Sequence, residues 1–169
     1  MFDINLSSFI RKIIFTLLSI GALTACSHTD IYISDGEKIS GPKEIAIQGP
    51  RSPWAIKIEH QLKRQGFKAL RWASQYQTFE KESDDKTHLY NSAATRYVVR
   101  IEGTTHFGEA NRCFGGGYKF NYIVVDLVDI AENKTLASYS GSGYSEGCPP
   151  LSGSIFRDAA DTVNSQWVK

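Results

Sequence analysis

The sequence lacks an excess of charge of either sign, because 19 Lys and Arg side chains are balanced by 18 Asp and Glu side chains. The net charge of +1 leaves no electrostatic footprint for nucleic acid, so we expect no nucleic-acid partner. Charged residues make up 22% and hydrophobic residues 41% of the 169-residue chain. This ordinary mixture excludes a mainly disordered, collagen-like or coiled-coil protein, and the length is that of one domain.

The chain also lacks a motif for a metal or a cofactor. The four histidines are isolated from one another in the sequence, at His28, His60, His88 and His106. Gly115-Gly116-Gly117 has the composition of a phosphate loop, but it has no following Lys-Ser/Thr pair and leads into a predicted strand. We therefore expect no cofactor and no metal, and we interpret the three glycines as a flexible hairpin tip.

No hydrophobic run reaches the ~20 residues that a membrane-spanning helix needs. Residues 13–25 form an uncharged, mostly apolar run that follows Arg11 and Lys12 and ends in small residues. This order is typical of a secretory signal peptide, so we predict that residues 1–25 are a leader that is removed. A one-pass membrane anchor is the less favoured alternative because the run is short.

The leader ends in Leu23-Thr24-Ala25-Cys26, which resembles the lipobox of bacterial lipoproteins. The resemblance implies cleavage before Cys26, a diacylglycerol thioether on the Cys26 thiol, and an acyl group such as palmitate on the new amino group. Several acyl chains would make the attachment stable, because one chain alone binds only marginally. Ser27 in place of Asp implies, by the same resemblance, export to the outer membrane. The alternative is a plain cleaved signal that leaves Cys26 as a free thiol.

If Cys26 carries lipid, Cys113 and Cys148 remain as one pair. Residues 118–129 and 135–145 are predicted to be two strands of one hairpin, and the two cysteines flank its open end. Antiparallel pairing brings those strand ends together, and an exported chain meets oxidising conditions. We therefore predict a Cys113–Cys148 disulfide. Two free thiols are the alternative, and a cysteine metal site is disfavoured because no second close ligand pair is present.

We expect the mature chain to consist of a lipidated cysteine and tether over residues 26–43 and a single globular domain over residues 44–169. A strand over 43–48, a helix begun by Ser52-Pro53 and a strand over 67–72 imply a right-handed parallel crossover. Further elements are a solvated loop over 73–88, a short helix over 89–93, strands over 96–105, 118–129 and 136–145, and a final helix over 154–167. The predicted fold class is α+β, with a mixed, mostly antiparallel sheet, an N-terminal βαβ crossover and helices packed on the sheet.

Gly143-Tyr144-Ser145-Glu146-Gly147 has the G-x-S-x-G spacing of a hydrolase nucleophile elbow. That elbow needs a helix directly after the serine, but Cys148-Pro149-Pro150 follows here and prevents one. We interpret the segment as a turn beside the predicted bridge. A position of Ser145 or Ser142 within hydrogen-bond reach of His106 would instead favour a hydrolase.

Aromatic residues gather in the predicted hairpin, among them Tyr118, Tyr122 and Tyr144. They would form a stacking platform for a glycan or a peptide if they were exposed together, and the alternative is that they belong to the core. Asp129 ends the first hairpin strand, and we expect its side chain to shape the turn.

The layout resembles small Gram-negative envelope lipoproteins of the kind that includes penicillin-binding-protein activators and curli-secretion lipoproteins. The matching segments are Leu23-Thr24-Ala25-Cys26, the strand-helix-strand over residues 44–72, Ala94-Thr95-Arg96-Tyr97-Val98-Val99, Val124-Val125-Asp126-Leu127-Val128-Asp129 and Thr135-Leu136-Ala137. The resemblance implies a non-catalytic binding or scaffolding accessory that is anchored to the membrane and docks on another envelope protein. The alternatives are a small envelope hydrolase and a glycan- or inhibitor-type binder that uses the aromatic hairpin.

Overall fold

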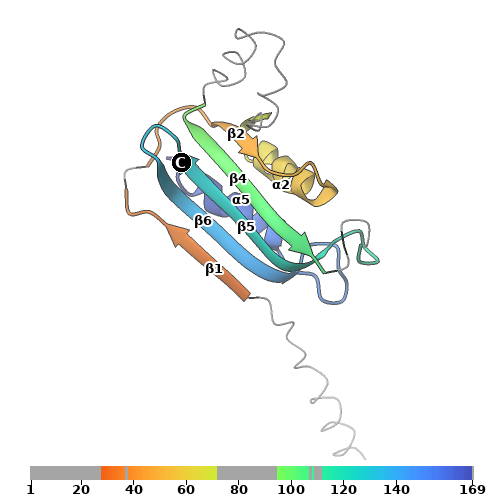
Figure 1. The fold of residues 1–169 in the computed structure, drawn as a ribbon. Coiled ribbons are helices and arrows are strands. Elements are labelled where there is room, and N and C mark those ends of the chain that lie inside the picture. The colour runs from red at the N-terminus through yellow and green to blue at the C-terminus, as the bar shows by residue number, and fades with distance from the viewer. Residues whose placement is uncertain (1–27, 37, 72–94, 107, 109–111, 169) are drawn as a thin grey trace, which may run out of the picture.

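Six strands form one sheet in the order β1-β6-β5-β4-β2-β3 within the part of the chain that the structure describes (Figure 1). The computed structural model describes residues 28–36, 38–71, 95–106, 108 and 112–168. The elements are β1 (His28–Ile33), β2 (Glu44–Gln48), α2 (Pro53–Arg64), β3 (Lys68–Arg71), β4 (Tyr97–Thr105), β5 (Lys119–Asp129), β6 (Lys134–Tyr144) and α5 (Ile155–Asn164).

The sheet is mixed. β1, β6, β5 and β4 pair antiparallel in that order, whereas β2 pairs parallel with both β4 and β3. The predicted α+β class and the mixed sheet are therefore confirmed. α2 lies between the parallel strands β2 and β3 in the chain, and the predicted right-handed crossover at this segment stays a prediction.

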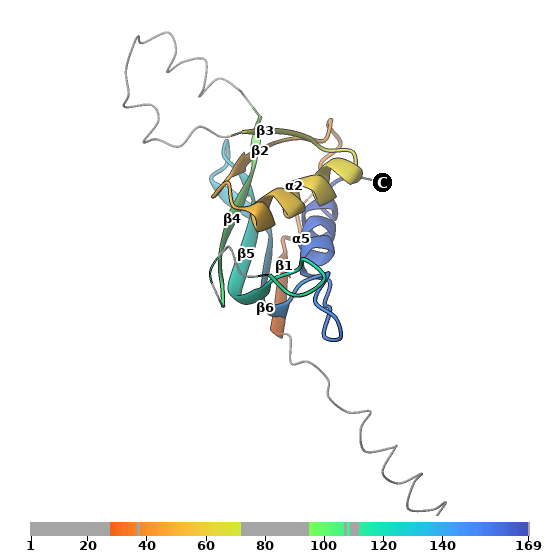
Figure 2. The ribbon, with the colours of Figure 1, turned by 90° about the vertical axis from the view of Figure 1, so that its right-hand side faces the viewer.

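Both described helices, α2 and α5, cover the same face of the sheet (Figure 2). α2 begins where the sequence predicts, because the Ser52 hydroxyl accepts a hydrogen bond from the Ala55 amide at 3.4 Å and Pro53 occupies the first turn. Its buried face includes Ile58 and Leu62. Neither described helix combines the length and apolar character needed to cross a membrane.

Aromatic rings fill the space between the helices and the sheet. The ring of Phe120 on β5 lies edge-on to Trp54 of α2 at 5.4 Å and to Phe156 of α5 at 5.9 Å. Tyr118 is fully buried beside them, with its ring 6.2 Å from that of Phe120. Such edge-to-face pairs add to the stabilisation that comes from burying large apolar surfaces. Much of the aromatic hairpin therefore belongs to the core.

Residues 28–33 form β1 and pair with β6 from His28 opposite Ser142 to Ile33 opposite Ala137. The assignment of residues 26–43 to a tether is therefore wrong for this part of the segment. The backbone of Ile39 also bridges to Trp167, which ties the following residues to the end of the chain. The physical reason is that the β-branched residues Thr29, Ile31 and Ile33 alternate with His28, Asp30 and Tyr32, and β-branched side chains favour strands.

Several predictions lie outside the described residues. They concern the leader over residues 1–25, the lipidated Cys26, the loop over 73–88 and the short helix over 89–93, and they stay predictions.

Candidate functional site: a cleft beside Arg96 and Asp129

A cleft of about 570 Å³ lies where β4 begins and where β5 turns into β6. Its walls come from the segment between β1 and β2, the first residues of β4 and the β5–β6 turn. Residues on these walls include Lys38, Glu44, Thr95, Tyr97, Lys134 and Leu136, in addition to Arg96, Asp129 and Glu132. The cleft therefore joins segments that are distant in the sequence.

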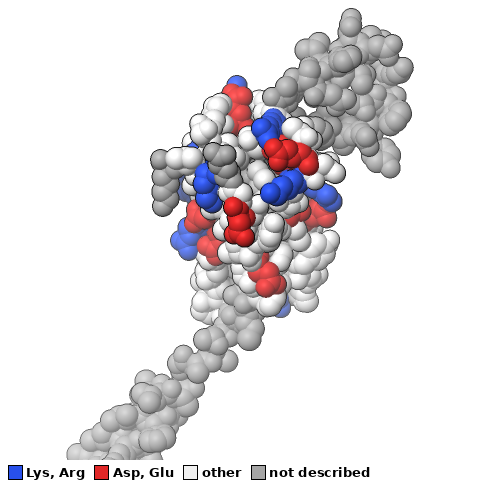
Figure 3. All heavy atoms as spheres, turned by 90° about the vertical axis from the view of Figure 1, so that its left-hand side faces the viewer, with Lys and Arg blue, Asp and Glu red and all other residues white. Residues whose placement is uncertain are grey.

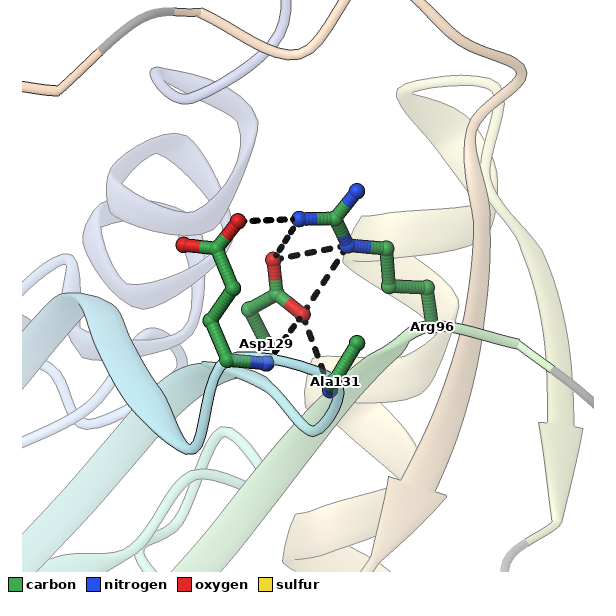
Figure 4. Close-up of polar contacts among 4 residues, drawn as sticks. Arg96, Asp129 and Ala131 are labelled. Atoms are coloured by element: carbon green, nitrogen blue, oxygen red, sulfur yellow. Dashed lines mark hydrogen bonds and ion pairs between the residues drawn. The ribbon is translucent and has the colours of Figure 1, made fainter.

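The carboxylate of Asp129 is the centre of a hydrogen-bond network at this cleft (Figure 4). Arg96 donates from Nε to both carboxylate oxygens, at 3.0 and 2.8 Å, and its Nη2 lies 2.7 Å from Oδ2. The backbone amides of Ala131 and Glu132 donate to Oδ1 at 3.0 and 3.3 Å. The expectation that Asp129 shapes the turn is confirmed by these two amide contacts.

Asp129 is 2% exposed, and its environment acts on its pKa in two opposite directions. Burial raises the pKa, because it disfavours the charged form. The hydrogen bonds from Arg96 and from the Glu132 and Ala131 amides outweigh burial and lower the pKa below its ordinary value. Asp129 is therefore a fixed negative charge at neutral pH.

Arg96 links the buried acid to the solvent-exposed rim of the cleft. Its Nη2 also reaches Oε1 of Glu132 at 2.7 Å, and its guanidinium lies over the ring of Tyr97 at 5.6 Å. The hydrogen bond to Asp129 raises the pKa of Arg96 above its ordinary value, and burial acts in the opposite direction without cancelling this rise. The Nη1 atom points away from both carboxylates (Figure 4), and the Arg96 side chain is 48% exposed, so this end of the guanidinium can donate to an acceptor on a ligand.

The charges around the cleft have both signs. Its lining contains the basic residues Lys38 and Lys134 and the acidic residues Glu44 and Glu132. Tyr97 contributes an aromatic wall, and its ring packs edge-on against that of Trp167 at 5.5 Å. A cleft of mixed charge does not select a small ion of one sign. It suits a polar ligand or a protein segment that carries both donors and acceptors. Within the described ranges, no three His, Cys, Asp or Glu side chains are placed to hold a metal ion.

Ser145 of the G-x-S-x-G segment lies at the opposite end of the sheet and is fully buried. Its hydroxyl oxygen accepts a hydrogen bond from the Tyr118 amide at 2.9 Å, and the hydroxyl donates to the Glu146 carbonyl at 3.1 Å. The imidazole of His106 contacts the side chain of Asn121 at 3.0 Å. Ser145 therefore fixes the backbone of the two strand ends and is not presented as a nucleophile.

The predicted Cys113–Cys148 disulfide is present, with the two Cα atoms 4.9 Å apart. Glycines allow the two bridged segments to approach this closely. A Cβ atom on Gly117 would overlap the Glu146 carbonyl and would lie 2.7 Å from the Cys148 sulfur. Gly147 has a φ of 77° and lies against Gly115. The glycines that suggested a phosphate loop and an elbow thus pack against each other at the bridge.

The three tyrosines of the suggested platform do not form one exposed surface. Tyr118 is completely buried, so its assignment to an exposed patch is wrong. Tyr122 is exposed on β5, and Tyr144 is partly buried with the Lys119 ammonium 5.4 Å from its ring centre. The core takes Tyr118, which directly precedes β5, and Phe120, whereas the register with β6 shifts between Phe120 and Ile123, and Tyr122 in this interval is exposed.

No protein-family model matches the chain, and no curated protein matches it. Among solved structures, similar chains occur in two crystal forms of a PelC dodecamer from Paraburkholderia phytofirmans, one of them from a leucine-to-methionine variant. Both are 15% identical with a TM-score of 0.46 and cover 83% of this chain, corresponding to 98% and 99% of their own chains. This similarity is too distant to assign the chain to a family, so the interpretation of the cleft depends on its own geometry.

Proposed function

We propose that this protein is an outer-membrane lipoprotein whose domain faces the periplasm and acts as a non-catalytic binding accessory of the cell envelope. The Cys113–Cys148 bridge supports an exported domain, because such bridges persist in oxidising compartments. His28 is the second residue after Cys26 and begins β1. Lipid on Cys26 would therefore hold this end of the sheet within about 10 Å of the membrane, since each residue spans at most ~3.6 Å.

The fixed charge of Asp129 is the observation that favours binding over catalysis at the cleft. A proton-transfer group works best with a pKa near the working pH, whereas the pKa of Asp129 is shifted away from neutrality. Arg96 is held by the same network, so the cleft presents a preorganised wall of charges. Preorganised donors and acceptors reduce the entropy lost on binding. The ligand that fits this mixture is a segment of an envelope protein with both acidic and basic side chains.

The structure gives little support to the two alternative functions. A hydrolase that uses Ser145 would need its hydroxyl free, but that hydroxyl makes two hydrogen bonds to the backbone. A glycan-binding platform would need the tyrosines exposed together, but Tyr118 is in the core. The Arg96–Asp129 cleft therefore remains the surface on which we place the binding function.

The anchor is tested by comparing the full chain with its Cys26→Ala variant in Gram-negative cells that are fed an alkyne-tagged palmitate. We expect label on the full chain and its flotation with outer-membrane vesicles, and we expect neither for Cys26→Ala. Mass spectrometry of the mature N-terminus gives an independent readout. An unmodified Cys26 or a retained leader would contradict the anchor.

The cleft is tested by placing a photoactivatable amino acid at Lys134, on the rim, in the full chain in cells. The control position is Arg157 on α5, which is also exposed and lies outside the cleft. We expect one prominent adduct from position 134, none from position 157, and loss of the adduct when Lys38→Glu reverses a charge on the rim. Equal adducts from both positions, or an adduct that Lys38→Glu leaves unchanged, would contradict binding in this cleft.

A further inference from the structure

β1 is an outer strand of the sheet and carries a group of exposed apolar side chains. Ile31, Tyr32 and Ile33 are 54%, 53% and 41% exposed. In the described part of the sheet, β1 pairs on one side only, with β6. Outer strands with these properties tend to pair with another chain, and proteins commonly protect such edges with short strands and lysines. β3, the opposite outer strand, has that protection, since it is four residues long and begins with Lys68.

The register with β6 determines which backbone groups of β1 face outward. The Ser34 amide donates to the Leu136 carbonyl at 2.8 Å, in the same register as the rest of the strand. In an antiparallel ladder, alternate residues direct both their N–H and C=O groups to the same neighbouring strand. His28, Asp30 and Tyr32 therefore bond to β6. The N–H and C=O groups of Thr29, Ile31 and Ile33 point toward the free edge.

We propose that β1 pairs antiparallel with β1 of a second copy of this chain, across a two-fold axis at Ile31. In this register Ile31 lies opposite the partner's Ile31, and Thr29 lies opposite the partner's Ile33. In this register, every residue of β1 whose backbone groups point outward lies opposite such a residue of the partner's β1. Each such pair exchanges two backbone hydrogen bonds, so the whole free edge is satisfied.

Side-chain chemistry selects the same register. Residues that lie opposite each other in an antiparallel pair have their side chains on the same face of the sheet. Ile31 would therefore contact the partner's Ile31, and Thr29 would contact the partner's Ile33. On the other face, Asp30 lies opposite the partner's Tyr32. A shift by two residues in one direction places Asp30 opposite the partner's Asp30, where like charges repel. A shift in the other direction leaves Thr29 without a partner.

The wider surface also permits this approach. On the side of the molecule where β1 lies, basic and acidic side chains are interspersed (Figure 3). Two copies related by a two-fold axis bring identical patches together, so a patch of one sign would repel itself. The pairing involves β1 alone and needs neither lipid on Cys26 nor a ligand in the Arg96–Asp129 cleft. Its failure and the failure of the proposed function are therefore distinguishable.

The pairing is tested by cysteine crosslinking of full chains in cells, with products separated on non-reducing gels. A hydrogen-bonded antiparallel pair has Cα atoms ~5.5 Å apart, which a disulfide can span. We expect Ile31→Cys to give a covalent dimer in roughly tenfold excess over the unsubstituted chain, which measures any background from Cys26. Ile33→Cys alone is the matched control, because in this register its own counterpart lies four residues away along the strand. A mixture of Thr29→Cys and Ile33→Cys chains should crosslink again.

A second variant tests the hydrogen bonds themselves. Ile31→Pro removes only an outward-facing N–H and leaves the β6 ladder intact, so the domain should fold while the Thr29→Cys and Ile33→Cys mixture loses its crosslink. Equal dimer from Ile33→Cys and Ile31→Cys would overturn the register, and an Ile31→Cys signal no higher than background would overturn the pairing. If Ile31→Cys crosslinks to a different protein, that protein and not a second copy is the partner of β1, and the proposal is also overturned.

Discussion

The two ends of the sheet are held together by different chemistry. At one end, the Cys113–Cys148 bridge joins segments whose close approach depends on Gly117. At the other end, Arg96 and two backbone amides hold the buried carboxylate of Asp129. The first end depends on redox conditions and on steric fit, and the second depends on protonation and salt. The cleft lies at the second end, where charged groups face the solvent.

This difference shows what the two glycine-rich motifs contribute to the fold. Close packing at the bridged end leaves Ser145 buried, with its hydroxyl used by the backbone. The charged end keeps Arg96 48% exposed while its partner is buried, so the same residue stabilises the turn and faces the cleft. Substitutions at the two ends should therefore lower the free energy of unfolding by different amounts and under different solution conditions.

The largest effect is expected from Gly117→Ala. The added Cβ would overlap the Glu146 carbonyl and lie 2.7 Å from the Cys148 sulfur, so both the local backbone and the bridge must shift. We expect a loss of roughly 4 kcal/mol or more in the free energy of unfolding, measured by urea denaturation. Gly41→Ala is the control, because its added Cβ meets nothing within 4 Å. Equal stability of the two variants would show that this end tolerates looser packing.

The next effect is expected from removing the bridge with Cys113→Ala and Cys148→Ala together. The bridge closes a loop with a sequence separation of 35 residues. On the chain-entropy model, such a loop contributes about 4 kcal/mol. The double variant should lose this amount in oxidising buffer, and reductant should destabilise the unsubstituted chain but not the variant. A melting temperature that reductant leaves unchanged in the unsubstituted chain would contradict a stabilising bridge.

At the charged end, Asp129→Asn should destabilise the domain by about 1–3 kcal/mol, because the amide keeps an acceptor for the turn but loses the charge that pairs with Arg96. The matched control is Asp126→Asn on the same strand, where the side chain lies on the other face of the sheet. Chemical denaturation at pH 7 measures both variants. Equal losses would mean that the contribution comes from the strand and not from the Arg96 contact.

The same carboxylate should give this end a pH dependence that the bridged end lacks. The pKa of Asp129 is lower in the folded protein than in the unfolded chain, so the unfolded chain binds the proton more readily. The contribution of Asp129 is therefore fully present well above pH 4 and is lost as the pH falls below about 4. The difference in unfolding free energy between the unsubstituted chain and Asp129→Asn should shrink over this range. A constant difference down to pH 2 would contradict the lowered pKa.

Local signals in the sequence were sufficient for most of the fold. Ser52-Pro53 marks the start of α2, and the alternation over residues 118–129 and 135–145 marks the hairpin, from which the bridge follows. β1 was missed because its polar residues were grouped with the segment that follows, although Thr29, Ile31 and Ile33 show the period of two that strands have.

The cleft could not be found in the same way. Arg96 and Asp129 are 33 residues apart, and they meet only because β4 pairs antiparallel with β5 in the register that places Tyr97 opposite Asp129. Both strands were predicted from their patterns, but a pattern within one strand carries no information about its neighbour or about register. A hypothesis that β4 pairs with β5 in this register would have predicted the contact between Arg96 and Asp129.

The smallest effect is expected from Glu132→Gln, which removes the exposed partner of Arg96 and leaves Asp129 in place. Exposed ion pairs contribute little, because water and salt screen them. The loss should be far below that of Asp129→Asn and should vanish at about 0.5 M salt, where the screening length is only a few ångströms. Glu102→Gln is the control, since it removes a comparably exposed partner of Arg100 on β4. If Glu132→Gln costs as much as Asp129→Asn at high salt, the exposed acid and not the buried one positions Arg96, and the cleft wall would move with the solvent-facing turn.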